Sequence, residues 1–225
     1  GSVNSVRVLT AYKQMNITIV LGPFQPLPPA GFGAVEKIWV ELARDFVRRG
    51  HQVTIIGRGD SGERGMTVRK GVRIMSLRGF DASGHIAIDL LKDFIYALHI
   101  IFIVPKSDVI VTNSFWTPVI LSPFKRWKGR IVVHVARFPK GQMWLYRGTD
   151  ILQAISTVVA RAIREQSPRV QDKVRVLGYP VNLSIFTPDR TGVSSNRNPS
   201  VVYVGRVHPE KGIHLLVEAF RRVIK

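Results

Sequence analysis

Residues 15–57 read MNITIVLGPFQPLPPAGFGAVEKIWVELARDFVRRGHQVTIIG, and this stretch decides the fold. Ile17–Leu21 is a continuously apolar, β-branched run, which is typical of a parallel strand buried on both faces. Residues 35–47 carry apolar side chains at helical spacing, and Gly50 is a natural helix stop. A second buried run, QVTIIG, follows. Strand, loop, helix and strand within about 45 residues predict the start of a doubly wound α/β domain.

The same alternation continues toward the C-terminus. Further strands are predicted at 72–77, 108–114, 130–136, 150–156 and 173–181, and further helices at 86–104, 118–125 and 157–166. We therefore expect a mostly parallel, Rossmann-like sheet of six or seven strands.

The predicted sheet sets the domain boundaries. We expect the Rossmann-like domain to span residues 15–188, because MNITIVLG runs directly into the first strand. Residues 1–14 are interpreted as a tag remnant or an upstream extension. The polar stretch 189–200 is interpreted as a linker. Residues 201–225 are expected to be the first strand and helix of a second, truncated α/β domain.

Composition excludes several kinds of chemistry. Cysteine is absent, which rules out disulfides, thiolate metal sites and a cysteine nucleophile, and no metal site is predicted. Lys and Arg number 33 against 15 Asp and Glu, so the formal net charge is +18. Such a surplus indicates an anionic partner: nucleic acid, an acidic membrane or a phosphorylated substrate. The most apolar window, residues 86–105, contains Asp89, Lys92, Asp93 and His99, so we expect a buried or interfacial helix rather than a membrane span.

The loop before the first helix is the first candidate site, because ligands of open α/β sheets bind beyond the carboxyl ends of the strands. Gly31 and Gly33 stand where free N–H groups and the helix dipole can receive an anion. The match to the dinucleotide fingerprint G-x-G-x-x-G is poor, since Glu36 occupies the place of its third glycine. A glycine-rich loop that only turns the chain is the structural alternative.

Two later loops also follow predicted strands. Asn113, with Ser114 and Trp116, is a candidate for lining a sugar or acceptor pocket. His134 stands at or near a strand end, and Arg137 and Lys140 come after it in a loop that suits a phosphate beside a sugar ring. The alternatives are a polar loop with a packing aromatic, a core histidine and a solvated basic face.

Two further groups of cations are candidates for anion binding. Arg206 and Lys211 flank a loop between the strand and helix predicted after residue 200, where they could hold a diphosphate, although the spacing is not that of a Walker loop. Aromatic and basic residues are interleaved in SPFKRWKGR, which suits an acidic membrane or another anion. The members of this basic patch are Lys125, Arg126, Trp127 and Lys128.

Two of these stretches together resemble the N-terminal half of family 4 retaining glycosyltransferases of the GT-B fold. PPAGFGAVEKIWVELARDFVRRGHQVTIIG is similar to the family's glycine-rich loop with Glu, followed by a helix ending in Arg-Gly-His-x-Val-Thr. VVYVGRVHPEKGIHLLVEAF is similar to its Gly-Arg-x-x-x-x-Lys-Gly segment. Both occur in the family's order, about 170 residues apart. The resemblance implies two Rossmann-type domains facing each other across a cleft.

The resemblance also implies roles for individual residues. His134 matches a histidine near the donor sugar and is the catalytic candidate. The donor diphosphate would be bound by Gly33, Arg206 and Lys211. The acceptor side would be formed by Gly31, Asn113, Arg137 and Lys140. The family commonly has histidine at the position of Asn113, and no role is carried onto Tyr179, Pro180 or Asn182, which depart from its pattern.

The implied reaction is transfer of a sugar, with retention, from a nucleotide-diphosphate sugar to a hydroxyl acceptor in cell-surface polysaccharide, lipopolysaccharide or glycolipid synthesis. A UDP-sugar is favoured over a GDP-sugar, and no cofactor is expected. We expect a cytoplasmic protein with peripheral contact at the inner face of the membrane. The family's pair of glutamates in the second domain has no counterpart here, so the chain alone is expected to be inactive.

Two alternatives stay open. One is a non-catalytic binding or regulatory half-domain that needs a partner chain; separately, residues 201–225 are a candidate surface for forming a homo-oligomer. The other is a basic nucleic-acid-binding protein, although the sequence has no helix-turn-helix, zinc-finger or RNP-type motif.

Overall fold

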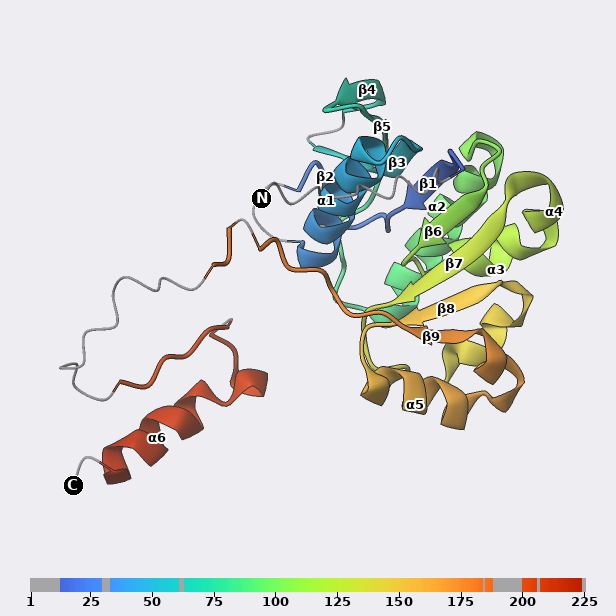
Figure 1. The fold of residues 1–225 in the computed structure, drawn as a ribbon. Coiled ribbons are helices and arrows are strands. Elements are labelled where there is room, and N and C mark those ends of the chain that lie inside the picture. Colours follow the sequence, from blue (N-terminus) through green and yellow to red (C-terminus); the bar gives the residue numbers. More distant parts are fainter. Residues whose placement is uncertain are drawn as a thin grey trace, which may run out of the picture. The chain divides into compact units, whose positions relative to one another are not determined.

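The computed structural model describes residues 13–29, 33–60, 63–183, 185–187, 200–205 and 207–223 (Figure 1). The chain divides into two compact units, Gly1–Pro180 and Val181–Lys225, and each is described by itself.

The first unit holds the sheet. Its strands are β1 (Asn16–Val20), β2 (Pro26–Leu27), β3 (Gln52–Gly59), β4 (Gly65–Arg69), β5 (Val72–Leu77), β6 (Val109–Thr112), β7 (Arg130–Val135), β8 (Ile151–Ala154) and β9 (Val174–Val176). Its α-helices are α1 (Ala34–Arg48), α2 (Ile86–Ile103), α3 (Thr117–Leu121), α4 (Lys125–Lys128) and α5 (Thr157–Gln166). Its 3-10 segments are η2 (Ser122–Phe124), η3 (Gln142–Gly148) and η4 (Pro168–Lys173).

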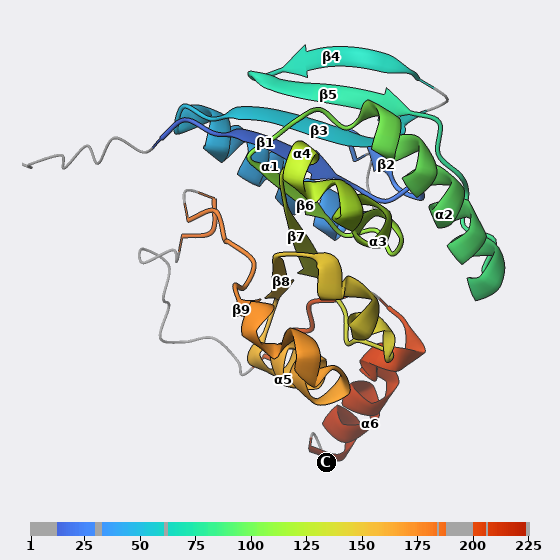
Figure 2. The same ribbon diagram turned by 90° about the vertical axis from the view of Figure 1, so that its right-hand side faces the viewer.

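The strands follow the order β4-β5-β3-β1-β6-β7-β8-β9, and β2 pairs with β3 (Figure 2). All described pairs are parallel except β4–β5. The predicted doubly wound α/β class is therefore confirmed, but the strand count was wrong, because the described part of the chain has nine strands. The prediction missed β2, which has only two residues, and β4, whose residues are all exposed and so give no apolar pattern.

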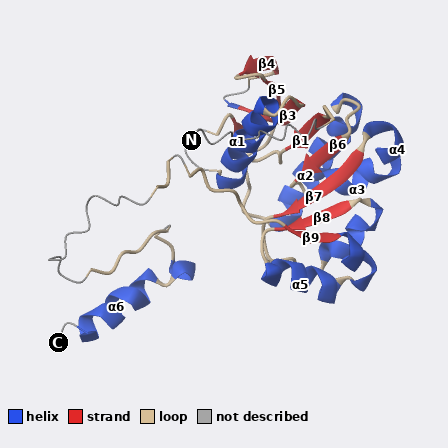
Figure 3. Ribbon diagram, viewed as in Figure 1, coloured by secondary structure: helices blue, strands red, loops and turns tan. Residues whose placement is uncertain are grey.

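Helices cover both faces of the sheet (Figure 3). Successive side chains of a strand point to opposite faces, so the alternation in β1 divides the core in two. Ile17 and Ile19 belong to the cluster that contains Trp39 and Ala43 of α1. Val20 instead joins the cluster formed with α2, α3 and α5. Apolar side chains are therefore needed on both faces of this strand, and its one polar side chain, Thr18, is hydrogen-bonded to Ser107.

Strand β1 also lies at the point where the strand order reverses. The chain passes from β1 through α1 to β3 on one side, and the later strands β6 to β9 extend the sheet on the other side. The carboxyl ends of β1 and β6 therefore form the topological switch point, where open α/β sheets bind ligands.

Gly129 joins α4 to β7 at the opposite end of the sheet. Its φ is 132°, a region that favours glycine, and a Cβ placed there would lie 2.1 Å from the carbonyl oxygen of Ser107. The close approach accompanies a hydrogen bond from the Ser107 N–H to the carbonyl of Lys128, 2.8 Å long. Only glycine satisfies both the backbone angle and the available space.

The second unit contains η5 (Pro209–Lys211) and α6 (Ile213–Val223). The predicted helix is confirmed. The predicted strand over Val201–Val204 is not observed: Val202 and Val204 are 78% and 91% exposed, and no described strand pairs with this segment. A strand requires a neighbour for its N–H and C=O groups, which the apolar pattern of one segment does not supply.

The structure predicts a large cost for adding a methyl group at residue 129. Gly129→Ala should lower the free energy of unfolding by about 3–5 kcal/mol, since backbone strain and a steric overlap combine. Gly50→Ala is the matched control, because Gly50 also has a positive φ, 89°, but a Cβ there meets nothing within 4 Å. It should cost only about 1–2 kcal/mol. Equal urea midpoints for the two variants would contradict the steric argument.

Candidate functional site

The N-terminus of α1 lies beyond the end of β1, at the switch point. Gly33 is its N-cap residue, with φ 108°, and no side chain caps the helix there. A Cβ on Gly33 would come within 2.8 Å of the Glu36 carboxylate, so the carboxylate packs over the glycine. Glu36 is buried, and its negative charge interacts favourably with the positive end of the helix. An acidic side chain therefore already lies where the sequence predicts a donor phosphate.

His134, the predicted catalytic residue, is buried near the end of β7. Its Nε2 lies 3.1 Å from the Tyr179 hydroxyl, and its ring meets the edge of Trp39 with centroids 5.3 Å apart. Its Nδ1 is buried and has no hydrogen-bond partner among the described residues. Burial lowers the pKa of His134, and the neighbouring Gln153 side chain only partly offsets this. The imidazole is therefore neutral near pH 7, and its buried Nδ1 is left without a partner in the described part of the chain.

Tyr179 connects His134 to the start of α1. Burial raises the pKa of its hydroxyl, and the negative charge of Glu36 raises it further. The phenol is 36% exposed, so one edge faces solvent. We call Gly33, Glu36, Trp39, His134 and Tyr179 the His134 cluster. It combines a carboxylate, a neutral imidazole, a phenol and an indole, which is a set suited to the hydroxyl groups of a sugar.

Sequence reasoning found two of the five members. Gly33 and His134 were predicted from their places in loops after strands, and the structure brings their neighbourhoods together. Trp39 was assigned only to the apolar face of a helix. Glu36 was noted only as a mismatch to a dinucleotide motif. Its spacing from Trp39 places this acidic residue on the buried side of α1, and that unusual position could have identified it as a site residue. Nothing in the local sequence indicates that Tyr179 contacts a histidine 45 residues earlier.

The loop after β6 serves mostly to hold α2 and α3 together. The backbone N–H of Trp116 donates to the carboxylate of Asp93 at 2.8 Å, and its indole N–H donates to the carbonyl of Leu90 at 3.1 Å. The hydroxyl of Ser114 lies 2.6 Å from that of Thr117. Burial raises the pKa of Asp93, although these donors oppose the shift. These hydrogen bonds give Ser114 and Trp116 a structural role, and the pocket role expected of them stays a prediction.

Asn113 is still a candidate ligand-binding residue. Its side-chain oxygen is buried and has no hydrogen-bond partner among the described residues. Such an unsatisfied acceptor is costly unless water or a ligand supplies a donor. Asn113 follows β6 directly, at the switch point, so this oxygen is available to a donor at the same edge of the sheet as the His134 cluster.

The predicted acceptor-side cations Arg137 and Lys140 lie after β7 on an exposed loop. The loop backbone is held by Gln142, which accepts from the N–H of Lys140, and by Gln166, which accepts from the N–H of Gly141. The side chains of Arg137 and Lys140 form no hydrogen bond or ion pair with another described residue. They are available for an anion, but no contact places them in the His134 cluster.

The basic patch is divided between structural and free residues. Lys125 pairs with Asp150 at 2.9 Å, and Lys128 donates to the carbonyl of Val104 at 2.9 Å. Partial burial alone would raise the pKa of Asp150, but the Lys125 contact and the N–H of Ile131 lower it overall. Arg126 and Trp127 are exposed. Only these two members of the patch are therefore free to meet an external anion.

The cations of the predicted diphosphate site belong to the segment 201–225. Lys211 is exposed in η5 of the second unit, and Arg206 lies outside the described residues. Gly31, predicted on the acceptor side, lies outside them as well. In the described ranges no group of three or more His, Asp or Glu side chains is placed to hold a metal ion. None of the helices described above is long and apolar enough to cross a membrane.

Solved structures with the same fold are glycosyltransferases at low sequence identity. The catalytic domain of starch synthase IV from Arabidopsis thaliana, bound to ADP and acarbose, superposes with a TM-score of 0.59 at 12% identity, covering 94% of this chain and 66% of that one. Sucrose-phosphate synthase from Thermosynechococcus elongatus gives 0.66 at 15% identity, covering 93% and 60%. HepE of Anabaena, in complex with UDP-glucose, gives 0.53 at 10% identity, covering 79% and 47%.

These likenesses establish the fold, and the chain spans about two thirds or less of the length of each of these three proteins. No curated protein sequence matches the chain. The model of the glycosyl transferase 4-like domain matches residues 33–180, which is more than half of the chain and includes the whole His134 cluster. The chain therefore belongs to the glycosyl transferase 4-like family, with the Rossmann-like fold of a GT-B N-terminal domain.

Proposed function

We propose that this chain forms the acceptor-binding half of a retaining glycosyltransferase, which moves a sugar from a nucleotide-diphosphate sugar to a hydroxyl acceptor. The observation that carries the proposal is the His134 cluster, a set of side chains suited to sugar hydroxyls at the switch point of a glycosyl transferase 4-like domain. Further support comes from the free acceptor oxygen of Asn113 near the same edge.

In the proposed reaction the bond between the anomeric carbon and the donor diphosphate breaks, and the diphosphate leaves with the electron pair. A new bond forms to the acceptor oxygen on the same face of the sugar, and the acceptor hydroxyl passes its proton to the departing diphosphate oxygen. Glu36 would accept a hydrogen bond from a hydroxyl of the acceptor. His134 would use Nδ1 to hydrogen-bond the transferred sugar, because in either tautomer this nitrogen offers one donor or one acceptor.

The donor diphosphate would be bound by Arg206 and Lys211 rather than at Gly33, because the Glu36 carboxylate repels a phosphate beside that glycine. Positive charge at the leaving diphosphate stabilises the transition state more than the ground state. We infer a UDP-sugar as donor, as in the HepE complex with UDP-glucose; starch synthase IV, which shares the fold, is bound to ADP, so an ADP-sugar is the competing donor. No cofactor is needed for this chemistry.

The net charge of +18 supports an acceptor carried at an anionic membrane surface. We therefore place the reaction at the cytoplasmic face of a membrane, in the synthesis of a cell-surface polysaccharide, lipopolysaccharide or glycolipid. The acceptor would be a saccharide linked to a lipid or polyprenyl diphosphate, and exposed Arg137 and Lys140 would meet its phosphate groups.

Nucleotide-sugar binding tests the proposal. In a thermal-shift panel on the full gene product, a UDP-sugar should raise the melting temperature by a few degrees, more than GDP- or ADP-sugars do. His134→Ala should abolish the additional shift that the sugar gives over UDP alone and lower kcat/KM for transfer about 100-fold, because one transition-state hydrogen bond is lost. Anomeric NMR of the product should show retention.

The matched control is His85→Ala, an exposed histidine that makes no contact with the cluster, and it should leave both readouts unchanged. A protein that responds to no nucleotide sugar would refute the proposal. Tight binding of single-stranded DNA with a steep salt dependence would instead favour the nucleic-acid alternative.

A pH titration of stability tests the state of His134. Its folded pKa lies below its ordinary value of 6.5, so below pH 6.5 the unfolded chain binds a proton that the folded chain does not. The free energy of unfolding should therefore fall as the pH drops from about 6.5 through the lower folded pKa, by at most about 1.4 kcal/mol per pH unit. His134→Gln should flatten this part of the urea-denaturation profile, whereas His85→Gln should not. An unchanged profile in His134→Gln would show that the imidazole is not held neutral.

A further inference from the structure

Helix α2 is apolar on two opposite sides. One side packs against the sheet through Tyr96, Ala97 and Ile100, which are all buried. The other side carries exposed apolar side chains at intervals of three and four residues, which place them in one line along the helix. This α2 stripe consists of Ile88, Leu91, Ile95, Leu98 and Phe102, each between 40% and 82% exposed. A surface helix normally has polar residues on that side.

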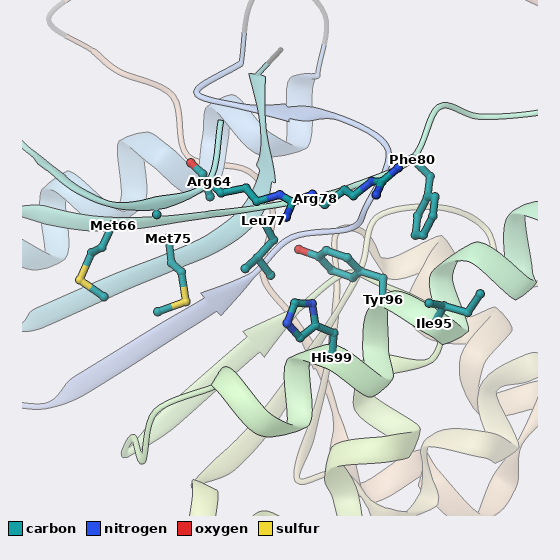
Figure 4. Close-up of a pocket in the computed structure, with 11 residues that line it drawn as sticks. Arg64, Met66, Met75, Leu77, Arg78, Phe80, Ile95, Tyr96 and His99 are labelled. Carbon is teal, nitrogen blue, oxygen red and sulfur yellow. The ribbon is translucent and has the colours of Figure 1, made fainter. Parts of the chain in front are cut away.

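A cavity of about 580 Å³ borders the α2 stripe (Figure 4). It lies between α2 and the strands β4 and β5, and Ile95 belongs to both the stripe and the cavity wall. Its apolar lining includes Met66, Met75, Leu77 and Phe80. The volume is in the usual range for a site that takes a small molecule or part of a chain molecule.

The polar groups of the cavity select for negative charge. Arg64, Arg78 and His99 line it, and none of its 11 lining residues, all of them described, is acidic. The Tyr96 side chain is 2% exposed, and its hydroxyl points toward Leu77 in the wall without a hydrogen-bond partner among the described residues (Figure 4). An apolar hollow with two guanidinium groups and a spare hydroxyl fits a ligand that has an alkyl chain and an anionic head.

Charge decides which occupant covers the stripe. A second copy of the chain would bring another +18 of formal charge to the surface, which opposes association. An anionic bilayer offers both an apolar phase for the stripe and phosphates for the arginines. Since the opposite side of α2 packs on the sheet, the helix would lie in the plane of the membrane interface instead of spanning it.

We propose that the α2 stripe and the adjoining cavity form a binding site for anionic phospholipid of a membrane surface. The stripe inserts among the acyl chains, an acyl chain enters the cavity, and Arg64 and Arg78 bind the phosphate. The site is distinct from the His134 cluster and shares no residue with it. The inference deepens the proposed membrane-bound function, since it names the surface that would hold the enzyme beside its acceptor.

Vesicle sedimentation tests the site with phosphatidylcholine vesicles that contain or lack about 30% phosphatidylglycerol. The anionic vesicles should bind the protein, and Leu98→Glu or Phe102→Glu should each weaken binding at least 10-fold, because a carboxylate opposes insertion. The matched control is Val158→Glu, which adds the same charge at an apolar position of α5 that is 64% exposed, and it should change binding less than twofold. All three substitutions are at exposed positions, so the fold should be retained.

The arginines are tested with Arg64→Ala/Arg78→Ala against Arg161→Ala/Arg164→Ala, which removes the same charge from exposed positions of α5. The Arg64→Ala/Arg78→Ala double variant should bind anionic vesicles about 30-fold more weakly, or about fivefold per arginine. The control double variant should lose clearly less affinity. Equal effects of the two pairs, equal binding to neutral vesicles, or equal effects of Phe102→Glu and Val158→Glu would overturn the proposal. A dimer in analytical ultracentrifugation that Leu98→Glu dissociates would assign the stripe to a second copy instead.

The two proposals can fail separately. In the full gene product, Phe102→Glu should retain transfer to a water-soluble acceptor, because Phe102 is 82% exposed and is not a member of the His134 cluster. Loss of vesicle binding with transfer intact confirms the membrane site in a working enzyme, whereas vesicle binding without any transfer would refute the proposed function alone.

Discussion

Burial of β1 on all sides is the constraint on which the first unit depends. The strand is hydrogen-bonded to β3 along one edge and to β6 along the other, and its two faces are covered by different helices. ITIVL meets these demands because four of its residues are apolar and the buried hydroxyl of Thr18 is paired with that of Ser107 at 2.7 Å. Because β1 is also where the strand order reverses, the same five residues that fill the centre of the core bring the ends of β6 and β7 next to the start of α1. The candidate site is thus built on the most constrained element of the molecule.

The sequence revealed those parts of the fold whose burial leaves a repeating pattern. Strands β1, β3, β6 and β7 were predicted because apolar residues run through them, and α1, α2 and α5 because their apolar residues recur at helical spacing. Strand β4 was missed because its stability comes from hydrogen bonds to β5 and not from a buried face. The segment Val201–Val204 shows the converse: an apolar run alone does not make a strand where no described neighbour pairs with it. An apolar pattern in the sequence indicates which residues are buried, whereas the pairing of a strand depends on a neighbouring strand elsewhere in the chain.

The residues of the candidate site also fall into two groups, those that the sequence identified and those that only packing brings together. Positions at strand ends identified Gly33, Asn113 and His134, because topology fixes where such residues lie. Glu36, Trp39 and Tyr179 join His134 only through packing between α1, β7 and the segment after β9, and no local motif reports that. Basic residues show the same dependence on packing: Lys125 and Lys128 belong to a predicted surface patch, and each is also bound to a carboxylate or carbonyl of the first unit. The large net charge is therefore an upper limit on the charge that partners can use.

Tyr179 is the second-last residue of the first unit, and the second unit begins at Val181. Its hydroxyl is the hydrogen-bond partner of His134 Nε2. Any rearrangement of the backbone at this junction must either carry the phenol along or pull it away from the imidazole. The environment of a ring in the middle of the sheet therefore depends on how the backbone is placed at the very end of the first unit.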